Sequence, residues 1–536
     1  MIPLLLLKEN FNQLCLLLHK CMKQKALRPG KQLHAALLTS GTDTNDNVSC
    51  KLVGLYASCS DLESAKLIFN QTLNPNVFAL NWMVSASAFH GLYADAIGYF
   101  QLMREMKMSP NQYTLYSVLK ACVGLMDVRK GREVHAAVHR LGSDEEIRLS
   151  NVLIDMYCKC ENLQYAGKVF DKMSKRDVIS WTCMISGYAN AKSMEKAVSL
   201  FNRMKMEEGL EPNDFTWNAM IAGFAQNGDW ENATMLFRQM GMEGLVPDFV
   251  TWNAVISGLA QNSQYDLAFE YFRDMLLSGV RLNQITITGL LPACGNTGSA
   301  ERGQEIHCLV YRMGMETSVF IGSALIDMYS KCGKVGAALN VFNQVRVKNV
   351  ACWNAMIGCY GKHCMMDSCI QLFERMQEEG AQANEITFTC VLSACSYSGL
   401  VEKGLEIFSS MEMSHGVKPI KEHYACAIDL LCRSGRLAEA FEFLKDLPVA
   451  ATDSVCGAFF NGCKIHGRQD LAEKMAQNIL QTDLKKPSGY VTLSNIYAAD
   501  GMWHKVENVR NEMKHKGMRK NPGFSSVHNP CTKSYP

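Results

Sequence analysis

Few of the residue types that do chemistry stand at the spacing that the chemistry needs. Cys456, Cys463 and His466 are candidates for a zinc site, but their spacing matches no usual zinc pattern and a fourth ligand is missing. Cys158 and Cys160 have one residue between them, whereas a redox pair of cysteines has two. We therefore predict no catalytic residue, no metal site and no cofactor.

Three histidines, His34, His135 and His307, each follow a glycine by four residues. They are far apart in the chain and each is expected on a helix of its own. We therefore expect them to make packing contacts and not to share a ligand. A basic stretch at residues 505–520 fits two interpretations equally well, a solvated helix face or a contact with an RNA backbone or a partner.

Composition limits the class of protein. The net charge is +2, so no global basic field marks a nucleic-acid binder, and any RNA binding must depend on local placement of groups. The 22 cysteines fall mostly on apolar helix faces, as Cys122, Cys294 and Cys395 do, which indicates small buried hydrophobes in a reducing compartment. No apolar run approaches the ~20 residues that span a bilayer, so we expect no membrane partner.

The elements that carry these residues repeat along the chain. Residues 214–248 and 249–283 are both 35 residues long and align without a gap. Trp217-Asn218-Ala219 in the first corresponds to Trp252-Asn253-Ala254 in the second. A fixed period of this size indicates a repeat array.

Each repeat is predicted to form two helices. Met220, Ile221 and Phe224 make one apolar stripe at helical spacing, and Gly228-Asp229 interrupts it. A second stripe follows at Trp230, Ala233, Leu236, Phe237 and Met240. One such hairpin cannot bury both stripes, but stacked neighbours can, which predicts a solenoid.

The repeats are of three kinds. One carries motifs such as WTCMISGYA (181–189), a second carries the Gly–His motif, and a shorter third carries DMYCKC (155–160) or DMYSKC (327–332). On these motifs, the sequence resembles plant pentatricopeptide-repeat proteins of the PLS subclass from about residue 11 to about residue 528. The resemblance implies an all-α, right-handed superhelical solenoid of helix-turn-helix repeats.

The resemblance also implies a domain organisation. Residues 1–10 form a leader that could be a short transit segment, residues 11–451 the repeat array, residues 452–523 an E-type extension of helical-hairpin repeats, and residues 524–536 a short tail. In the array the predicted repeats are L at 11–45, 112–146, 284–318 and 385–420; S at 46–76, 147–177, 319–349 and 421–451; and P at 77–111, 178–213, 214–248, 249–283 and 350–384.

The E-type extension bears on activity. Residues 521–525 mark the place where this extension usually passes into a deaminase-like DYW domain. A zinc deaminase needs a His-x-Glu and a Cys-x-x-Cys, and neither follows Pro522. We therefore expect that the chain does not deaminate by itself and is not an enzyme.

In this family, the fifth and the last residue of each P or S repeat contact one base of RNA, and one base is read by each repeat. Carried over to this sequence, the RNA-binding pairs are Asn81 with Asn111 (a pyrimidine, favouring C), Asn151 with Asp177 (U), Thr182 with Asn213 (A), Asn218 with Asp248 (U), Asn253 with Asn283 (a pyrimidine), Ser323 with Asn349 (A), and Asn354 with Asn384 (a pyrimidine). The chemistry fits, because Asn offers a donor and an acceptor and ionised Asp only acceptors. The predicted site is roughly Y-n-U-A-U-Y-n-A-Y.

Other positions refine this assignment. The second residue of each repeat is expected to wedge between bases; Phe78, Ile179, Phe215, Val250 and Phe320 suit that role, while Arg148 and Ala351 do not. Cys50 and Ala425 depart from the pattern at the fifth position, and the L repeats are left unassigned. A single fifth-position Asn could merely cap or solvate a helix start, but the registered pairs favour base reading. For Trp181, Trp217, Trp252 and Trp353 we expect core packing instead of base stacking.

The resemblance implies that the chain binds organellar single-stranded RNA and recognises sites for C-to-U editing. A DYW-type deaminase would act in trans, and small organellar RNA editing factors would bind the L repeats. The expected location is the mitochondrion, with the chloroplast as the alternative. Two other functions remain open: stabilisation, processing or splicing of a transcript without editing, and a helical-repeat scaffold that binds only protein.

Overall fold

The computed structural model describes residues 11–40, 46–142, 146–206, 209–445, 453–468, 470–475, 487–499 and 501–517. These residues form α-helices, and none of them lies in a β-strand. The chain divides into two compact parts, an N-terminal half (Met1–Val280) and a C-terminal half (Arg281–Pro536), and each is described by itself. The leader and the tail predicted at residues 1–10 and 524–536 lie outside the described residues.

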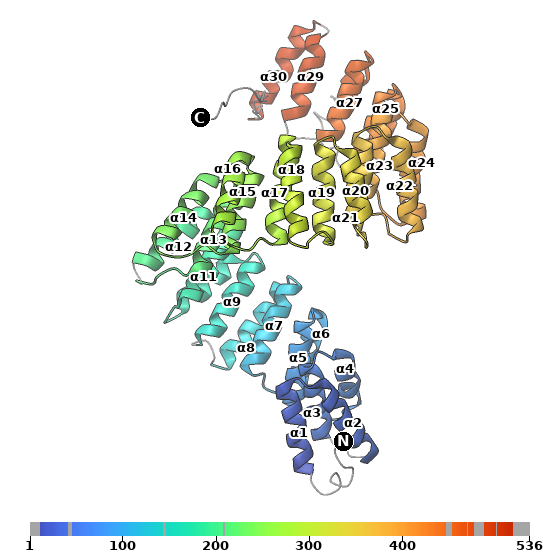
Figure 1. Ribbon diagram of the computed structural model, residues 1–536. Coiled ribbons are helices and arrows are strands. Elements are labelled where there is room, and N and C mark those ends of the chain that lie inside the picture. The colour runs from blue at the N-terminus through green and yellow to red at the C-terminus, as the bar shows by residue number, and fades with distance from the viewer. Residues whose placement is uncertain are drawn as a thin grey trace. The chain divides into compact units, whose positions relative to one another are not determined.

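The N-terminal half is a stack of helical hairpins, coloured blue to green in Figure 1. Each odd-numbered helix packs on the even-numbered helix that follows it and on the next odd-numbered helix, as from α3 to α5 and on to α15. The helices are α1 (Phe11–Gln24), α2 (Leu27–Ser40), α3 (Asp46–Ser58), α4 (Leu62–Gln71), α5 (Val77–Phe89), α6 (Tyr93–Glu105), α7 (Gln112–Gly124), α8 (Val128–Arg140), α9 (Ile147–Lys159), α10 (Leu163–Lys172), α11 (Val178–Asn190), α12 (Met194–Met206), α13 (Asp214–Gln226), α14 (Trp230–Met242), α15 (Phe249–Gln261) and α16 (Tyr265–Leu277).

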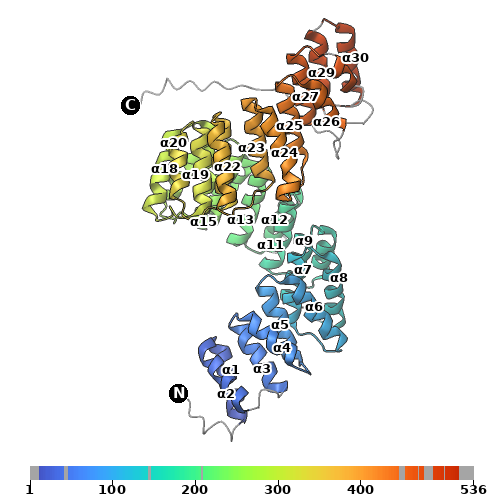
Figure 2. The same ribbon diagram turned by 90° about the vertical axis from the view of Figure 1, so that its right-hand side faces the viewer.

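The C-terminal half is built in the same way, and Figures 1 and 2 both show its odd-numbered helices side by side. Its helices are α17 (Gln284–Thr297), α18 (Ala300–Arg312), α19 (Val319–Lys331), α20 (Val335–Gln344), α21 (Val350–Lys362), α22 (Met366–Glu378), α23 (Glu385–Ser398), α24 (Val401–His415), α25 (Lys421–Arg433), α26 (Leu437–Lys445), α27 (Asp453–Ile465), α29 (Pro487–Ala499) and α30 (Trp503–His515). The predicted all-α solenoid of helical hairpins is confirmed.

The repeat starts expected from the sequence coincide with helix starts. Each predicted repeat, from residue 11 to residue 421, begins at the first residue of an odd-numbered helix. The S repeats are shorter because their second helix has 10 residues, as in α4, α10 and α20, where the P repeats have 13, as in α14.

The tryptophans of the P repeats join one repeat to the one before it. Trp217 is completely buried, and its ring lies edge-on to Phe201 of the preceding repeat with 5.1 Å between ring centroids. Trp181 with Phe170, Trp252 with Phe237, and Trp353 with Phe342 form the same pair at 4.9, 4.7 and 5.1 Å. The expectation that these tryptophans pack in the core is therefore confirmed, and edge-to-face contact adds to the stabilisation from burial.

The C-terminal helices share a core with the array. Phe459 and Phe460 of α27 are fully buried, together with Leu493 of α29 and Val506 of α30. This cluster continues into Leu431 of α25. Among the described helices, none is both long and apolar enough to cross a membrane.

Candidate nucleic-acid interface

The last residue of each predicted pair caps the first helix of the next repeat. Asn213 precedes α13, and its Oδ1 accepts hydrogen bonds from the backbone N–H of Thr216 at 3.0 Å and from the Thr216 hydroxyl at 2.9 Å. The same two bonds join Asn111 to Thr114, Asp177 to Ser180, Asp248 to Thr251, Asn283 to Thr286, and Asn384 to Thr387. Asn349 accepts the backbone N–H of Cys352 at 3.0 Å. These side chains are N-caps, which fixes their position at the junction of two repeats.

The fifth residues do not cap helix starts. Asn151 lies one turn further along α9, where its Nδ2 donates to Asp177 Oδ1 at 3.0 Å and its Oδ1 accepts from the Ser180 hydroxyl at 2.6 Å. The structure thus brings together a fifth and a last residue that are 26 positions apart in the sequence. The side chain is almost buried, with 6 % of the residue exposed.

Two further pairs have the same geometry. In the N-terminal half, Asn218 Nδ2 donates to Asp248 Oδ1 at 3.4 Å, and the Thr251 hydroxyl donates to Asn218 Oδ1 at 2.6 Å. In the C-terminal half, Asn354 Nδ2 donates to Asn384 Oδ1 at 3.1 Å, and the Thr387 hydroxyl donates to Asn354 Oδ1 at 2.7 Å.

The hydroxyl side chains at the fifth position are held differently. Thr182 donates to the Val178 carbonyl at 2.7 Å and shares a 2.7 Å hydrogen bond with the Thr216 hydroxyl. Ser323 donates to the Val319 carbonyl at 2.9 Å and lies 3.1 Å from the Cys352 sulfur. Both are short side chains that donate to a carbonyl of their own helix.

One pair is not fully joined, and another is divided between the two halves of the chain. Asn81 Oδ1 accepts from the Thr114 hydroxyl, but its Nδ2 is buried with no hydrogen-bond partner among the described residues. Asn253 belongs to the N-terminal half and Asn283 to the C-terminal half, so each is described separately. Asn253 is 7 % exposed.

The sequence interpretation missed the third residue of the following repeat. This position holds Thr114, Ser180, Thr216, Thr251, Thr286 and Thr387, each with 0 or 1 % of the residue exposed. A signal was present, because a hydroxyl residue three positions after an Asn or Asp is typical of an N-terminal cap. That the same hydroxyl also contacts the fifth residue of the preceding repeat follows only from the way the repeats stack.

The two carboxylates of the interface are ionised at neutral pH. Burial by itself raises the pKa of Asp177, but hydrogen bonds from Ser180 and Asn151 outweigh it and hold that pKa below its ordinary value. Asp248 follows the same pattern, with burial opposed by hydrogen bonds from Thr251, Asn218 and Val250. Both side chains therefore act only as acceptors.

The second residues of the repeats are apolar and exposed. Phe78, Ile179, Phe215, Val250 and Phe320 are 71, 56, 75, 44 and 65 % exposed. The second and fifth residues of one helix lie on the same face because they are three positions apart. Three L repeats, which the sequence interpretation left unassigned, also expose an apolar second residue, namely Tyr113, Ile285 and Ile386.

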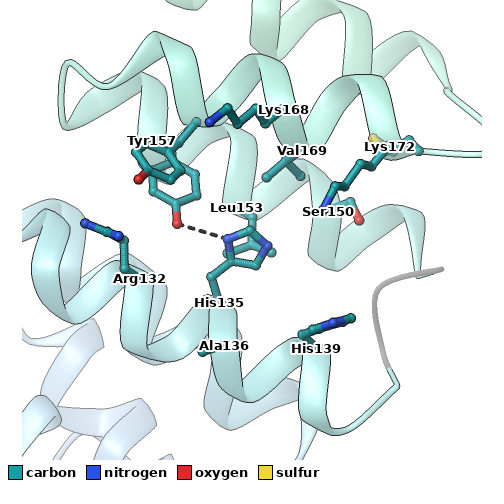
Figure 3. Close-up of a pocket in the computed structure, with 12 residues that line it drawn as sticks. Arg132, His135, Ala136, His139, Ser150, Leu153, Tyr157, Lys168, Val169 and Lys172 are labelled. Carbon is teal, nitrogen blue, oxygen red and sulfur yellow. Dashed lines mark hydrogen bonds between the residues drawn. The ribbon is translucent and has the colours of Figure 1, made fainter.

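The histidines of the L repeats are held in packing contacts. His135 Nδ1 lies 3.0 Å from the Tyr157 hydroxyl on the next odd-numbered helix, as Figure 3 shows. His34 with Tyr56 and His307 with Tyr329 form the same bond at 2.8 and 2.9 Å. The expectation that these histidines pack is therefore confirmed.

A cavity of about 570 Å³ lies beside His135, between α8, α9 and α10 (Figure 3). Three of the lining residues are Arg132, Tyr165 and Lys168. Arg132 Cζ lies 5.0 Å and Lys168 Nζ 5.1 Å from the centroid of the Tyr165 ring. None of the predicted RNA-binding residues lines it.

The cysteines are thiols on helix faces. Cys122, Cys294 and Cys395 are completely buried, and burial raises the pKa of Cys122 and Cys294 to about 12. The interpretation of these cysteines as small buried hydrophobes is confirmed. Within the described residues, no group of three His, Cys, Asp or Glu could hold a metal ion.

The basic stretch that begins at residue 505 is largely engaged within the protein. Lys505 pairs with Glu473 at 2.6 Å, Arg510 donates to the Ser494 hydroxyl at 2.9 Å, and Lys516 donates to the Tyr490 hydroxyl at 2.9 Å. Residues 518–520 of this stretch lie outside the described residues. The contacts favour a structural role for α30.

Family models match much of the chain. The PPR repeat family model matches residues 176–217, 212–253, 247–296 and 348–397, and the PPR repeat model matches residues 149–178, 323–350, 386–415 and 422–449. The E motif model matches residues 466–528.

The chain is also similar to pentatricopeptide repeat-containing proteins of Arabidopsis thaliana. One is 33 % identical, and the alignment covers 94 % of this chain and 73 % of the relative. A mitochondrial relative is 32 % identical over 95 % of this chain and 64 % of its own length, and a chloroplastic one is 32 % identical over 97 % and 56 %. The chain thus spans between about half and three quarters of the length of these relatives.

A solved structure has the same fold. The crystal structure of PPR10 from maize matches 93 % of this chain with a TM-score of 0.50 and 16 % identity. The structure of PPR10 in complex with an 18-nt psaJ RNA element matches 92 % of this chain and 84 % of that chain, with a TM-score of 0.52 and 17 % identity.

Proposed function

Because this chain belongs to the pentatricopeptide-repeat family, we propose that it binds single-stranded RNA and reads one base with each P or S repeat. The observation that carries the proposal is the repeated junction of a fifth residue, a last residue and a buried hydroxyl. It recurs at Asn151, Asn218 and Asn354. A polar cluster held in register at successive repeats is suited to read one base per repeat.

The predicted site is Y-n-U-A-U-Y-n-A-Y, and its bases are numbered 1 to 9 from the 5′ end. Asn151 with Asp177 faces base 3, Thr182 with Asn213 faces base 4, and Asn218 with Asp248 faces base 5. Exposed apolar second residues beside these pairs are suited to wedge between successive bases.

We further propose that the bound site directs C-to-U editing and that a DYW-type deaminase acts in trans. The match to the E motif at residues 466–528 supports this role. No His-x-Glu occurs anywhere in the 536 residues, so these residues do not supply the deaminase signature. Small organellar editing factors that bind the L repeats would complete the complex.

The proposed location is an organelle. The relatives' names include both mitochondrial and chloroplastic proteins, which supports an organellar location without favouring either compartment. Our proposal is the mitochondrion, with the chloroplast as the alternative.

The test compares organellar cDNA with genomic DNA in plants that lack this protein. We expect one or a few C-to-U sites to lose editing, with upstream bases that match the predicted site in register. If editing is unchanged but a transcript is lost, misprocessed or unspliced, RNA binding stands and the editing role is wrong. If no organellar RNA changes, a scaffold that binds only protein becomes the better account.

A further inference from the structure

We infer that the hydroxyl at the third position of each following repeat is a positioning residue that sets which atoms the fifth-position Asn offers to its base. Thr251 serves Asn218 in this way, Ser180 serves Asn151, and Thr387 serves Asn354. This inference rests on the proposed base reading. It adds a third residue, from the next repeat, to each pair.

The hydrogen bonds fix the orientation of the Asn amide from two sides. The single proton of the Thr251 hydroxyl is shared between Asn218 Oδ1 at 2.6 Å, the shorter contact, and Asp248 Oδ1 at 2.9 Å. Asn218 Nδ2 donates to Asp248 Oδ1. Turning the amide over would place its oxygen against the Asp248 oxygen and its nitrogen against the hydroxyl. Asn151 is held in the same manner by Ser180 and Asp177, with distances of 2.6 and 3.0 Å. One lone pair of the amide oxygen is therefore used within the protein, and the second N–H of Nδ2 remains as a donor for a ligand.

The last residue then decides the second atom that the base meets. Within the described residues, the hydrogen bonds to Asp248 all end on Oδ1, so Oδ2 remains an acceptor. A donor beside an acceptor complements uracil, in which a carbonyl oxygen adjoins the N3–H. Asn384 likewise accepts its bonds on Oδ1, which leaves its Nδ2 as a donor beside the donor of Asn354. Two donors complement the O2 and N3 acceptors of cytosine.

A hydroxyl residue occurs at this third position after every repeat that carries Asn at its fifth position. In the sequence, every repeat with Asn at its fifth position is followed by Ser or Thr at the third position of the next repeat: Thr114, Ser180, Thr251, Thr286 and Thr387. The four L repeats are followed there by Val48, Leu149, Ile321 and His423, and the repeat with Cys50 is followed by Ala79. Of the two repeats with a hydroxyl at the fifth position, the one with Thr182 is followed by Thr216 and the one with Ser323 by Cys352. A cap alone does not explain this distribution, because Asn76 caps α5 without a hydroxyl at Ala79.

The experiment measures binding of the full chain to RNA oligonucleotides that carry the predicted site with U or C at base 3 or base 5. The variants are Thr251→Val, which replaces the hydroxyl by a methyl of similar size, Thr251→Ser, which keeps the hydroxyl, and Ser180→Ala. Thr234→Val is the matched control, because among the described residues its hydroxyl bonds to the Glu231 carbonyl of its own helix, α14, and to no predicted RNA-binding residue. Thermal unfolding of each variant is followed in parallel.

Loss of one hydrogen bond is worth about 3- to 10-fold in binding. We expect Thr251→Val to weaken binding to the U5 oligonucleotide by this factor and to narrow the preference for U over C at base 5, with base 3 unaffected. Ser180→Ala should do the same at base 3 only. Thr251→Ser and Thr234→Val should behave as the wild type.

Other outcomes overturn the inference. If Thr251→Val keeps its preference at base 5, or if it weakens binding equally for every oligonucleotide and Thr251→Ser does so too, the hydroxyl acts in packing alone. If the wild type is indifferent to U or C at base 5, the proposed base reading itself is wrong, and the positioning role falls with it.

Discussion

At the scale of single residues, a last-position side chain uses one polar atom to cap a helix, and we propose that its other polar atom meets the base. The Oδ1 atom of Asp248 accepts two backbone N–H groups at the start of α15, and Oδ2 is left for a ligand. In Asn213 and Asn384 the same Oδ1 atom caps the helix, and Nδ2 takes the place of the second oxygen. An exchange between Asp and Asn should therefore keep the cap and change only the presented group.

Asp248→Asn should change the preferred base at position 5 from U to C. Because Asn and Asp are about equally good caps, we expect unfolding free energy to change by less than ~0.5 kcal/mol. Competition binding with oligonucleotides that differ only at base 5 measures the preference. Asp248→Ala is the control, since it should lose the cap, at about 0.5–2 kcal/mol, and the base preference together. An unchanged preference for U in Asp248→Asn would contradict the assignment of this pair.

The buried thiols lead to a pH prediction. Burial raises the pKa of Cys122, Cys294 and Cys463 to about 12, whereas an unfolded thiol has a pKa of about 8.5. Their contribution to stability is complete below the unfolded value and is lost as pH rises toward the folded value, because the unfolded chain releases protons first. We therefore expect the thermal midpoint to fall between about pH 9 and pH 12.

The same thiols should resist alkylation. Among the described cysteines, Cys308 and Cys364 are exposed. With iodoacetamide at pH 8 under native conditions, mass spectrometry should find these two modified and Cys122, Cys294 and Cys463 unmodified, because the thiolate is the reactive form. Rapid native alkylation of the three buried thiols would show that their helices open readily.

At the scale of elements, small residues let the odd-numbered helices approach closely. A Cβ added to Gly258 on α15 would lie 2.4 Å from the Ala225 Cβ and 3.2 Å from its Cα on α13. Neither atom can move without moving the helix. In the L repeats, a Cβ added to Gly131 on α8 would lie 2.5 Å from the Met156 sulfur, which belongs to a flexible side chain and can move more easily.

Gly258→Ala should destabilise the array by about 1–3 kcal/mol, because an extra carbon must be placed between two closely packed helices. Gly98→Ala is the matched control. It lies in the middle of α6 with no atom near the added Cβ, so it should stabilise the fold by up to ~1 kcal/mol. Chemical denaturation followed by circular dichroism measures both. A neutral Gly258→Ala would mean that α13 and α15 separate easily.

At the scale of the whole molecule, charge is nearly balanced, with 54 Lys and Arg against 52 Asp and Glu. Many of the charged side chains form ion pairs within the protein, such as Lys66 with Asp95 and Arg436 with Glu402. If the chain binds RNA as proposed, its affinity must therefore come mainly from base contacts and stacking and much less from phosphate attraction.

Binding should accordingly depend weakly on salt. A protein that neutralised a phosphate at each of nine bases would give a slope of about −6 for log K against log salt, from about −0.7 per phosphate. We expect a slope shallower than about −3, measured by fluorescence anisotropy at several KCl concentrations. A steep slope with little base preference would indicate a non-specific polyanion site.

The sequence by itself determined the period, the three kinds of repeat, the first residue of each odd-numbered helix from α1 to α25, and the burial of Trp217 and its equivalents. These features depend on apolar spacing and on caps, which act over a few residues of chain. The resemblance to the family rests on the same local motifs. For these features, reading the residues in order was sufficient.

The tertiary structure decided the contacts that join residues about 30 positions apart. That Asn218 meets both Asp248 and the Thr251 hydroxyl depends on how one repeat stacks on the next, and no local pattern encodes the distance between those atoms. The division at residues 280 and 281, inside the array predicted at 11–451, likewise appeared only in the structure. Packing between helices follows from the shapes of all the side chains at the contact, so only the folded chain fixed the atoms that we propose meet RNA.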